Sequence, residues 1–353
     1  MTDWTDPDVF GAVSDRVETL AKGTYFEEFT EGEAIRHDPG LRLTAHGNEY
    51  WASQTLNHDP VYWRPDVATE RGYREPPIHP DYLLACVMGP SVEDLSEKGG
   101  YFLGRSNVVV HEHEVYPGTA LRVESTVEAK RDSSSRPAYG IVTWETTGYD
   151  ADAGDPLLSY TRTNMVPRRE PLATDGSGES AASGAEPDLP AGPFVAPAGQ
   201  YFEDFQAALD RATERDGVVA YRHERGRTMD DVLVSTLPLL TLNTAKQHHD
   251  AHHMADSPSG EIVAYGDVTR SVALAHARSD ERTRRELGYD EERFHTFVTV
   301  GDTISALTRV LDATDADDPD AGRVTFRHYA VNQRDEPVYS GTRTVLVDRR
   351  PSN

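Results

Sequence analysis

The chain reads TLNTAKQHHDAHH over residues 241–253, directly after the apolar run 232–240. An earlier stretch, TLNHDPVY over residues 55–62, begins in the same way. Five residues after the shared asparagine comes His248 in the later copy and Tyr62 in the earlier one. Polar side chains gathered beside an apolar run are typical of a half-buried active-site loop. We therefore interpret the later copy as the working site and the earlier copy as a degenerate repeat.

Two further strings recur in the same order along the chain. YFEEF at 25–29 returns as YFEDF at 201–205, and TRTNMVPRR at 161–169 returns as TRTVLVDRR at 342–350. The copies that begin at 25, 55 and 161 are offset from their partners by 176, 186 and 181 residues. Similar offsets in one order indicate a tandem duplication. A length of 353 residues also favours two domains, each able to bury its own core.

The repeats predict two halves, residues 1–169 and 200–353, joined by a linker over 170–199. This segment is rich in Ala, Gly, Ser, Pro and acidic residues, and it is almost free of apolar ones before Phe194. Such a composition cannot bury enough surface to offset the entropy of ordering, so we expect an irregular connection. Residues 1–20 predict a short helix with acidic residues on its exposed side.

Each half has the same expected order of elements, a helix followed by strands. The apolar helical stretches are 80–88 in the first half and 268–277 in the second. Alternation and β-branched residues predict strands over 102–110, 119–127, 140–147, 157–166, 293–300, 303–311, 323–331 and 337–347. One helix followed by antiparallel strands, twice over, is an α+β plan.

The composition limits the classes of partner. Sixty acidic residues against 35 basic ones give a net charge of −25, and only four of the basic residues are lysines. Nucleic acids and anionic membranes need basic patches, so neither is an expected partner. An acidic surface of this kind is typical of proteins that work in high salt. A single cysteine, Cys86, excludes an internal disulfide framework and a cysteine-based zinc site.

Membrane insertion and export are also not expected. No apolar run approaches the ~20 residues of a membrane span, and the acidic N-terminus does not resemble a signal peptide. The sequence therefore predicts a soluble, cytoplasmic protein.

The histidine cluster has two readings that involve no catalysis. Imidazole and carboxylate are common metal ligands, and on a helix His248 and His252 would share a face, like the histidine pair of zinc proteases. No glutamate stands at the general-base position of that motif, so we predict no metal and no other cofactor. His249, His252 and His253 can also be read as solvated surface residues.

The spacing Asn243-x4-His248-x-Asp250 resembles the signature of the MaoC-type enoyl-thioester hydratases, which is usually Asp-x-Asn-Pro-x-His. Asn243 falls on the aspartate position of that signature and His248 on the histidine position. In the first copy, Asn57 and Tyr62 fall on these two positions. The resemblance implies a tandem hot-dog fold, in which each half wraps an antiparallel sheet around a central helix.

The string NTAKQHHDAH over residues 243–252 resembles most closely the two-domain mesaconyl-CoA hydratases, also called β-methylmalyl-CoA dehydratases, in the form found in halophilic archaea. This resemblance implies reversible hydration of mesaconyl-CoA to β-methylmalyl-CoA, in acetyl assimilation through a methylaspartate route. The implied partner is a CoA thioester, and no metal or redox cofactor takes part.

Hydration of a 2-enoyl thioester requires a base for the attacking water, a proton for Cα and donors for an enolate-like oxygen. His248 is the candidate base, because an imidazole titrates near neutral pH. Asn243 can orient the water but cannot take its proton. Asp250 is expected to orient His248 or to stabilise its charged form. The departure from the usual aspartate at position 243 leaves more of the proton transfer to His248.

The remaining candidate groups bind the substrate. Backbone N–H groups of Gly266, Asp267 and Val268, at the start of the second predicted helix, are the expected oxyanion donors. Arg227 or Arg270 is expected to bind the free carboxylate, although either can equally be read as a salt-bridge residue. Four further arginines are candidates for the CoA phosphates: Arg168, Arg169, Arg349 and Arg350. Asn57 and Tyr62, in the degenerate half, are expected to help shape the acyl pocket.

Three other functions stay open at this point. The chain can be read as a hydratase of another short 2-enoyl-CoA, as an acyl-CoA thioesterase on the same fold, or as a non-catalytic acyl-CoA-binding module. The number of chains in the assembly also stays open, since hot-dog halves commonly pair and one chain can already form a double unit.

Overall fold

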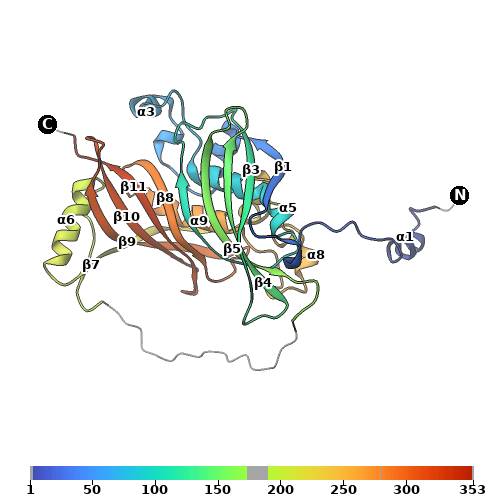
Figure 1. Ribbon diagram of the computed structural model, residues 1–353. Helices are drawn as coiled ribbons and strands as arrows, with labels where there is room; N and C mark the ends of the chain where they lie inside the picture. Colours follow the sequence, from blue (N-terminus) through green and yellow to red (C-terminus); the bar gives the residue numbers. More distant parts are fainter. Residues whose placement is uncertain (1–2, 173–189, 279, 352–353) are drawn as a thin grey trace.

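A single eleven-stranded sheet organises the molecule (Figure 1). The computed structural model describes residues 3–172, 190–278 and 280–351. The strand order is β1-β3-β4-β5-β2-β8-β11-β10-β9-β7-β6, so each half of the chain supplies one continuous part of the sheet. The strands are β1 (Ala34–Arg42), β2 (Tyr101–Val110), β3 (Ala120–Asp132), β4 (Tyr139–Asp150), β5 (Pro156–Pro167), β6 (Phe194–Val195), β7 (Val218–Thr228), β8 (Thr283–Phe294), β9 (Thr303–Asp315), β10 (Ala321–Val331) and β11 (Pro337–Asp348).

The two parts of the sheet are joined where β2 pairs with β8. The pairing is antiparallel, with Arg105 opposite Glu292 and Val109 opposite Gly288. A Cβ added to Gly288 would lie 2.3 Å from the carbonyl oxygen of Val108, so glycine is required for this close approach. The seam makes one sheet out of two repeats.

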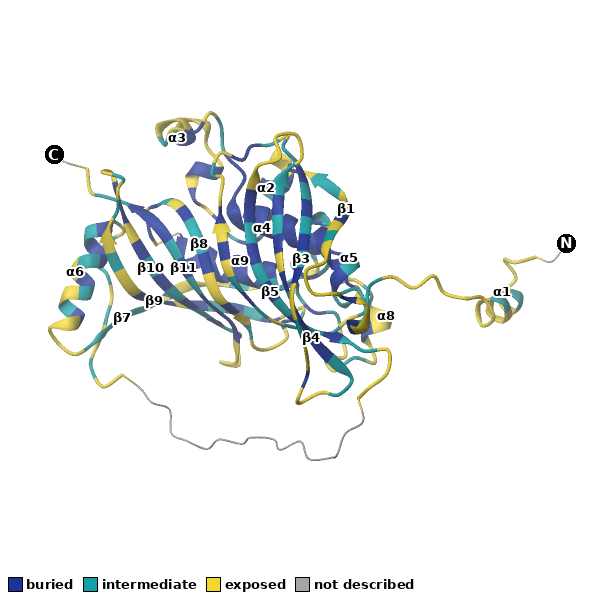
Figure 2. Ribbon diagram, viewed as in Figure 1, coloured by how far each residue is buried: buried dark blue, intermediate teal, exposed yellow. Residues whose placement is uncertain are grey.

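Two buried helices lie against this sheet, α4 (Pro80–Met88) and α9 (Gly266–Arg278), and both are dark blue in Figure 2. Proline at the first position and a hydrogen bond from the Asp81 N–H to His79 Nδ1 define the start of α4. Apolar residues of both helices belong to one hydrophobic cluster that spans both halves. The halves therefore share a core, which explains why they pack side by side.

The other helices lie nearer the surface. They are α1 (Pro7–Ser14), α2 (Ala45–Gln54), α3 (Pro65–Glu70), α5 (Val92–Leu95), α6 (Phe202–Thr213), α7 (Leu237–Leu240) and α8 (Ala251–Met254). Helix α1 lies away from the body of the molecule and buries no residue (Figures 1 and 2). In the part of the chain that the structure describes, no helix has the length and apolar character needed to cross a membrane.

Matching side-chain networks in the two halves support the duplication. His37 bonds Asp94 (2.6 Å) and Ser125 (2.8 Å) in the first half. His223 bonds Asp280 (2.6 Å) and Thr308 (2.7 Å) in the second.

The backbone repeats as well. Leu56 and Leu242, each immediately before the shared asparagine, both adopt a φ of 62°. A left-handed leucine is uncommon, so its recurrence at the same point marks the same turn.

Helix 80–88 and seven of the eight predicted strands are confirmed, with shifts of a few residues at their ends. Helix α9 begins two residues before the predicted start, at Gly266. The short N-terminal helix is confirmed as α1.

The strand predicted over 293–300 is wrong, because β8 runs over Thr283–Phe294 instead. The reason is charge: Glu286 and Glu292 of β8 are buried and paired with arginines, so this strand lacks the apolar alternation that the prediction relied on. The elements that were not predicted include strands β1, β6 and β7 and helices α2, α3, α5, α6 and α8.

The division into halves at 170–199 stays a prediction. Of this predicted linker, residues 173–189 lie outside the described residues. Its described end contains β6, in which Phe194 pairs in parallel with Val218 of β7.

Candidate active site

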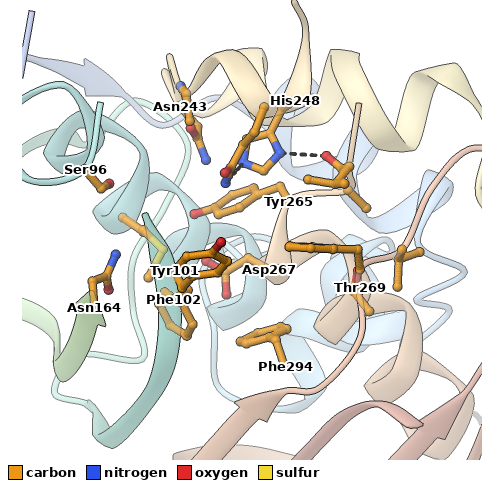
Figure 3. Close-up of a pocket in the computed structure, with 18 of the residues that line it drawn as sticks. Ser96, Tyr101, Phe102, Asn164, Asn243, His248, Tyr265, Asp267, Thr269 and Phe294 are labelled. Carbon is orange, nitrogen blue, oxygen red and sulfur yellow. Dashed lines mark hydrogen bonds between the residues drawn. The ribbon is translucent and has the colours of Figure 1, made fainter. Parts of the chain in front are cut away.

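A cavity of about 410 Å³ lies between the two halves. The second half contributes the loop residues Asn243 and His248 and the start of α9. The first half contributes Ser96, which precedes β2, together with residues of β2 (Tyr101, Phe102 and Arg105) and of β5 (Arg162 and Asn164). Figure 3 shows His248, Asn243 and Tyr265 close together, with Asn164 and Phe102 across the cavity. The site is therefore composite, with walls from both repeats.

The loop that carries Asn243 is fixed by backbone contacts. The Asn243 N–H donates to the carbonyl of Pro238 at 3.0 Å, and Leu242 before it holds the left-handed turn. Gly89, at the end of α4, packs against this turn so closely that an added Cβ would lie 1.7 Å from the Thr241 carbonyl oxygen. The first half therefore supports the loop of the second.

His248 is buried, with 3% of its surface exposed, and it lines the cavity. Its Nδ1 lies 2.7 Å from the carbonyl oxygen of Val263. A carbonyl only accepts, so Nδ1 carries the proton and Nε2 of the neutral ring is the acceptor. The side-chain amide nitrogen of Gln247 lies 3.3 Å from this Nε2. Burial lowers the pKa of His248 to about 4, against the opposing effect of the bond to Val263. The imidazole is thus a neutral base at physiological pH.

Asn243 presents its amide nitrogen as a donor. Its Oδ1 accepts the N–H of Ala245 at 3.0 Å, which fixes the orientation of the amide. The NH₂ group is then the part of this cavity-lining side chain left for a ligand or water. Asn243 and His248 together offer one donor and one acceptor, which is what a single water molecule between them needs.

The start of α9 supplies free backbone donors. Val268 N–H is bonded to the Tyr265 carbonyl at 3.0 Å, but no described residue accepts from the N–H of Gly266 or Asp267. Both residues line the cavity, and Val268 does not. An added Cβ at Gly266 would lie 2.9 Å from the Phe294 ring, so glycine allows this wall to close. Two of the three predicted oxyanion donors are therefore available.

Asp250 lies elsewhere than expected. Its carboxylate accepts the N–H of His253 at 2.9 Å and caps α8. The Val263 carbonyl, and not Asp250, bonds His248 Nδ1. His249 bonds the carbonyl of Thr244, and His252 and His253 are exposed. Within residues 3–172, 190–278 and 280–351, no group of three His, Cys, Asp or Glu side chains is arranged to hold a metal ion.

The two arginines proposed for the substrate carboxylate do not line the cavity. Arg227 bonds the carbonyl of Gln54 at 3.1 Å and pairs with Asp230. Arg270 is fully buried and pairs with Asp81 and Glu292. These carboxylates occupy the guanidinium, so Arg270 links α9 to α4 and β8 instead of facing a ligand.

The first copy of the loop is also outside the cavity lining. Asn57 Nδ2 lies 2.7 Å from His79 Nε2, and the Tyr62 ring packs on His79 with centroids 4.2 Å apart. In the second half the same two places hold His248 and Tyr265, 5.6 Å apart. The imidazole and the phenol have thus exchanged positions between the copies.

The four arginines proposed for the CoA phosphates are paired with surface carboxylates. The pairs are Arg168 with Asp132, Arg169 with Glu28, Arg349 with Asp315, and Arg350 with Asp204. None of the four lines the cavity.

The residues that sequence reasoning missed come from the first half. Arg162 and Asn164 lie inside the TRTNM string that was used only to recognise the repeat. A signal was present, because the second copy has Val345 where the first has Asn164. A polar residue that replaces a valine on a buried strand position is a candidate for binding.

The sequence of the chain is similar to known hydratases over nearly its whole length. A family model described as mesaconyl-CoA hydratase matches residues 3–349. A mesaconyl-CoA hydratase of Haloarcula marismortui is 62% identical, and the match covers 99% of this chain and 99% of that protein.

Two solved structures show the same fold. A putative MaoC domain dehydratase from Chloroflexus aurantiacus superposes with a TM-score of 0.79 and 21% identity, over 93% of this chain and 98% of that one. A Mycobacterium tuberculosis protein described as a double hotdog fold superposes with a TM-score of 0.71 and 20% identity, over 92% and 98% of the chains. The predicted α+β, tandem hot-dog fold is confirmed.

Proposed function

Because this chain belongs to the mesaconyl-CoA hydratase family, we propose that it is a hydro-lyase that adds water reversibly to mesaconyl-CoA, giving β-methylmalyl-CoA. The observation that carries the proposal is the neutral, buried His248, with its Nε2 unprotonated in a cavity bounded by the start of α9. A CoA thioester is the substrate, and the acyl group occupies the cavity.

The steps follow from the groups present. Asn243 donates to the oxygen of a water molecule, and His248 Nε2 accepts a proton from that water as its oxygen bonds to Cβ. The electron pair of the double bond moves toward the thioester oxygen, which the N–H groups of Gly266 and Asp267 stabilise. The imidazolium then returns the proton to Cα. The sum is the addition of H and OH, and dehydration runs the same steps backwards.

A second recess of about 250 Å³ adjoins the cavity and shares Ser96, Tyr101 and Gln247 with it. Two of the four lysines of the chain, Lys98 and Lys246, line this recess. Neither lysine forms a salt bridge with a described residue, in contrast to the paired surface arginines. On a protein of charge −25, these lysines are the local cations suited to the CoA phosphates.

The test is to follow the loss of enoyl-thioester absorbance with mesaconyl-CoA and to identify the product. The wild type should form β-methylmalyl-CoA, and His248→Ala should lose activity by about 10²- to 10⁴-fold, as expected when a general base is removed. His252→Ala, an exposed histidine of the same cluster, is the matched control and should keep its activity. Release of free thiol without a hydroxyacyl product would instead identify a thioesterase. Full activity of His248→Ala would rule out the mechanism above.

A further inference from the structure

Arg162, on β5, lines the cavity while only 2% of its surface is exposed. Its Nε and Nη2 atoms are buried and have no hydrogen-bond partner among the described residues. The ring of Trp144 lies 5.2 Å from the guanidinium carbon and supports one side of the group. A buried guanidinium without a carboxylate is costly, so this position is not explained by folding alone.

The second copy of the repeat provides an internal comparison. Arg343 stands at the position that corresponds to Arg162, in the TRT string of β11. It is fully buried, and it pairs with Glu286 at 2.7 Å and with Glu281. The protein therefore neutralises this arginine in one copy and leaves it without a carboxylate in the other.

Two neighbours of Arg162 add free polar groups to the same wall. Arg105 stands opposite Arg162 on β2 and holds Glu292 at 2.7 Å and Asp267 at 2.6 Å, but its Nη1 has no partner among the described residues. Asn164 lies two residues further along β5, on the same side of the strand, and its buried Oδ1 also has no partner there.

The charge of the cavity wall is positive. The lining contains two guanidinium groups, Arg105 and Arg162, and one carboxylate, Asp267. Arg105 is already bonded to Asp267 and to Glu292, so Arg162 is the lining guanidinium without a carboxylate among the described residues. An anion of the substrate would complete the balance.

We propose that Arg162, with the free Nη1 of Arg105, binds the free carboxylate of the acyl group. A guanidinium grips a carboxylate through two parallel hydrogen bonds, and mesaconyl-CoA carries such a carboxylate on Cβ, the carbon that water attacks. The inference rests on the proposed function and assigns its specificity: the second half supplies the base, and the first half selects a dicarboxylic acyl group. The degenerate repeat is thus retained as the binding wall.

The test compares two substrates on four proteins. The substrates are mesaconyl-CoA and (E)-2-methyl-2-butenoyl-CoA, in which a methyl group replaces the carboxylate. The proteins are the wild type, Arg162→Gln, Arg162→Lys and the control Arg343→Gln. Arg162→Gln should lower kcat/KM for mesaconyl-CoA by roughly 30- to 100-fold, since one charged hydrogen-bonding partner is lost, and should change kcat/KM for the methyl analogue by less than about 5-fold. Arg162→Lys should fall between, because it keeps the charge but not the fork.

Stability separates this role from a structural one. Arg162 has no carboxylate partner among the described residues, so Arg162→Gln should keep a melting temperature close to that of the wild type. Arg343→Gln removes the arginine that pairs with the buried Glu281 and Glu286, so this variant should melt at a lower temperature. It should change kcat/KM for both substrates by the same factor. If Arg162→Gln does not fold, Arg162→Lys tests the carboxylate site, through its ratio of kcat/KM for mesaconyl-CoA to kcat/KM for the methyl analogue.

The two proposals fail in different ways. A wild type that hydrates mesaconyl-CoA, combined with an unchanged substrate ratio in the Arg162 variants, would overturn the carboxylate site alone. A wild type that does not hydrate mesaconyl-CoA would overturn the proposed function.

Discussion

The Nδ1 atom of His248 lies 2.7 Å from the carbonyl oxygen of Val263, and this contact determines the chemistry of the ring. It fixes the proton on Nδ1 and so leaves Nε2 as the acceptor toward the cavity. A backbone carbonyl, unlike a carboxylate, does not add a negative charge that would hold the imidazole protonated. Burial can therefore keep the ring neutral, with Nε2 unprotonated.

The pH dependence of catalysis tests this environment. Since burial lowers the pKa of His248 to about 4, the base is neutral above this pH and protonated below it. We expect kcat/KM to be level from about pH 5 to pH 8 and to fall only below about pH 5, whereas an unperturbed imidazole would lose activity below about pH 6.5. The measurement is the initial rate of hydration across this range, with circular dichroism at each pH to exclude acid unfolding. An acid limb near pH 6.5 would contradict the structure.

Asn243→Asp should shift the acid limb of the pH profile to higher pH. A carboxylate beside His248 favours the protonated ring, so the apparent pKa should rise by about one unit, and the lost NH₂ donor should lower kcat. The matched control is Asn57→Asp, the same position in the first copy, which does not line the cavity and should leave the acid limb in place. An unchanged pH profile of Asn243→Asp would mean that Asn243 does not face the base.

Gly266→Ala should weaken the oxyanion site. The new Cβ would lie 2.9 Å from the Phe294 ring, so the ring or the start of α9 must shift. Overpacking of this kind costs about 1–3 kcal/mol, and displaced N–H groups lower kcat by about 10²-fold. The double variant Gly266→Ala with Phe294→Leu should recover part of both losses. Unfolding curves measure the loss of stability, and hydration kinetics measure the loss of kcat. Equal kcat in all variants would contradict the assignment of the oxyanion site.

Asp81→Asn should destabilise the fold without a change in substrate preference. Asp81 is buried between Arg270 and Arg278; burial alone would raise its pKa, but these two arginines lower it well below its usual range. Removal of the charge leaves two buried guanidinium groups short of a partner, at a cost of about 3–5 kcal/mol. Chemical denaturation measures the loss. Asp66→Asn, at an exposed pair with Arg64, should cost less than about 1 kcal/mol.

Replacement of Lys98 and Lys246 tests the recess for the CoA phosphates. The double variant Lys98→Ala with Lys246→Ala should raise KM by about 10-fold, because it removes the two lysine charges that line the recess, and should leave kcat near its original value. The effect should shrink in high salt, which screens exposed charges. Lys22→Ala, a lysine paired with Glu93 outside the recess, should leave KM unchanged.

Short-range patterns were enough to predict much of this molecule. The spaced repeats indicated the duplication, and the apolar run of residues 80–88 predicted α4 with its correct bounds. The loop with Asn243 and His248 was recognisable because its polar residues follow one another in the chain. Gly266 and Asp267, the donors proposed for the oxyanion, were also recognisable, because they are the first residues of a periodic helix.

Long-range partners decided the rest. The sequence identified arginines as candidates for an anion, but only the fold showed that Arg270 is neutralised by Asp81, nearly two hundred positions away, and that Arg162 is not neutralised. Strand β8 was missed for the same reason, since its buried glutamates are compatible with a core only through arginines from other elements. Local periodicity determines which segments form helices and strands, whereas the fate of a buried charge depends on which distant charges the tertiary structure brings to it.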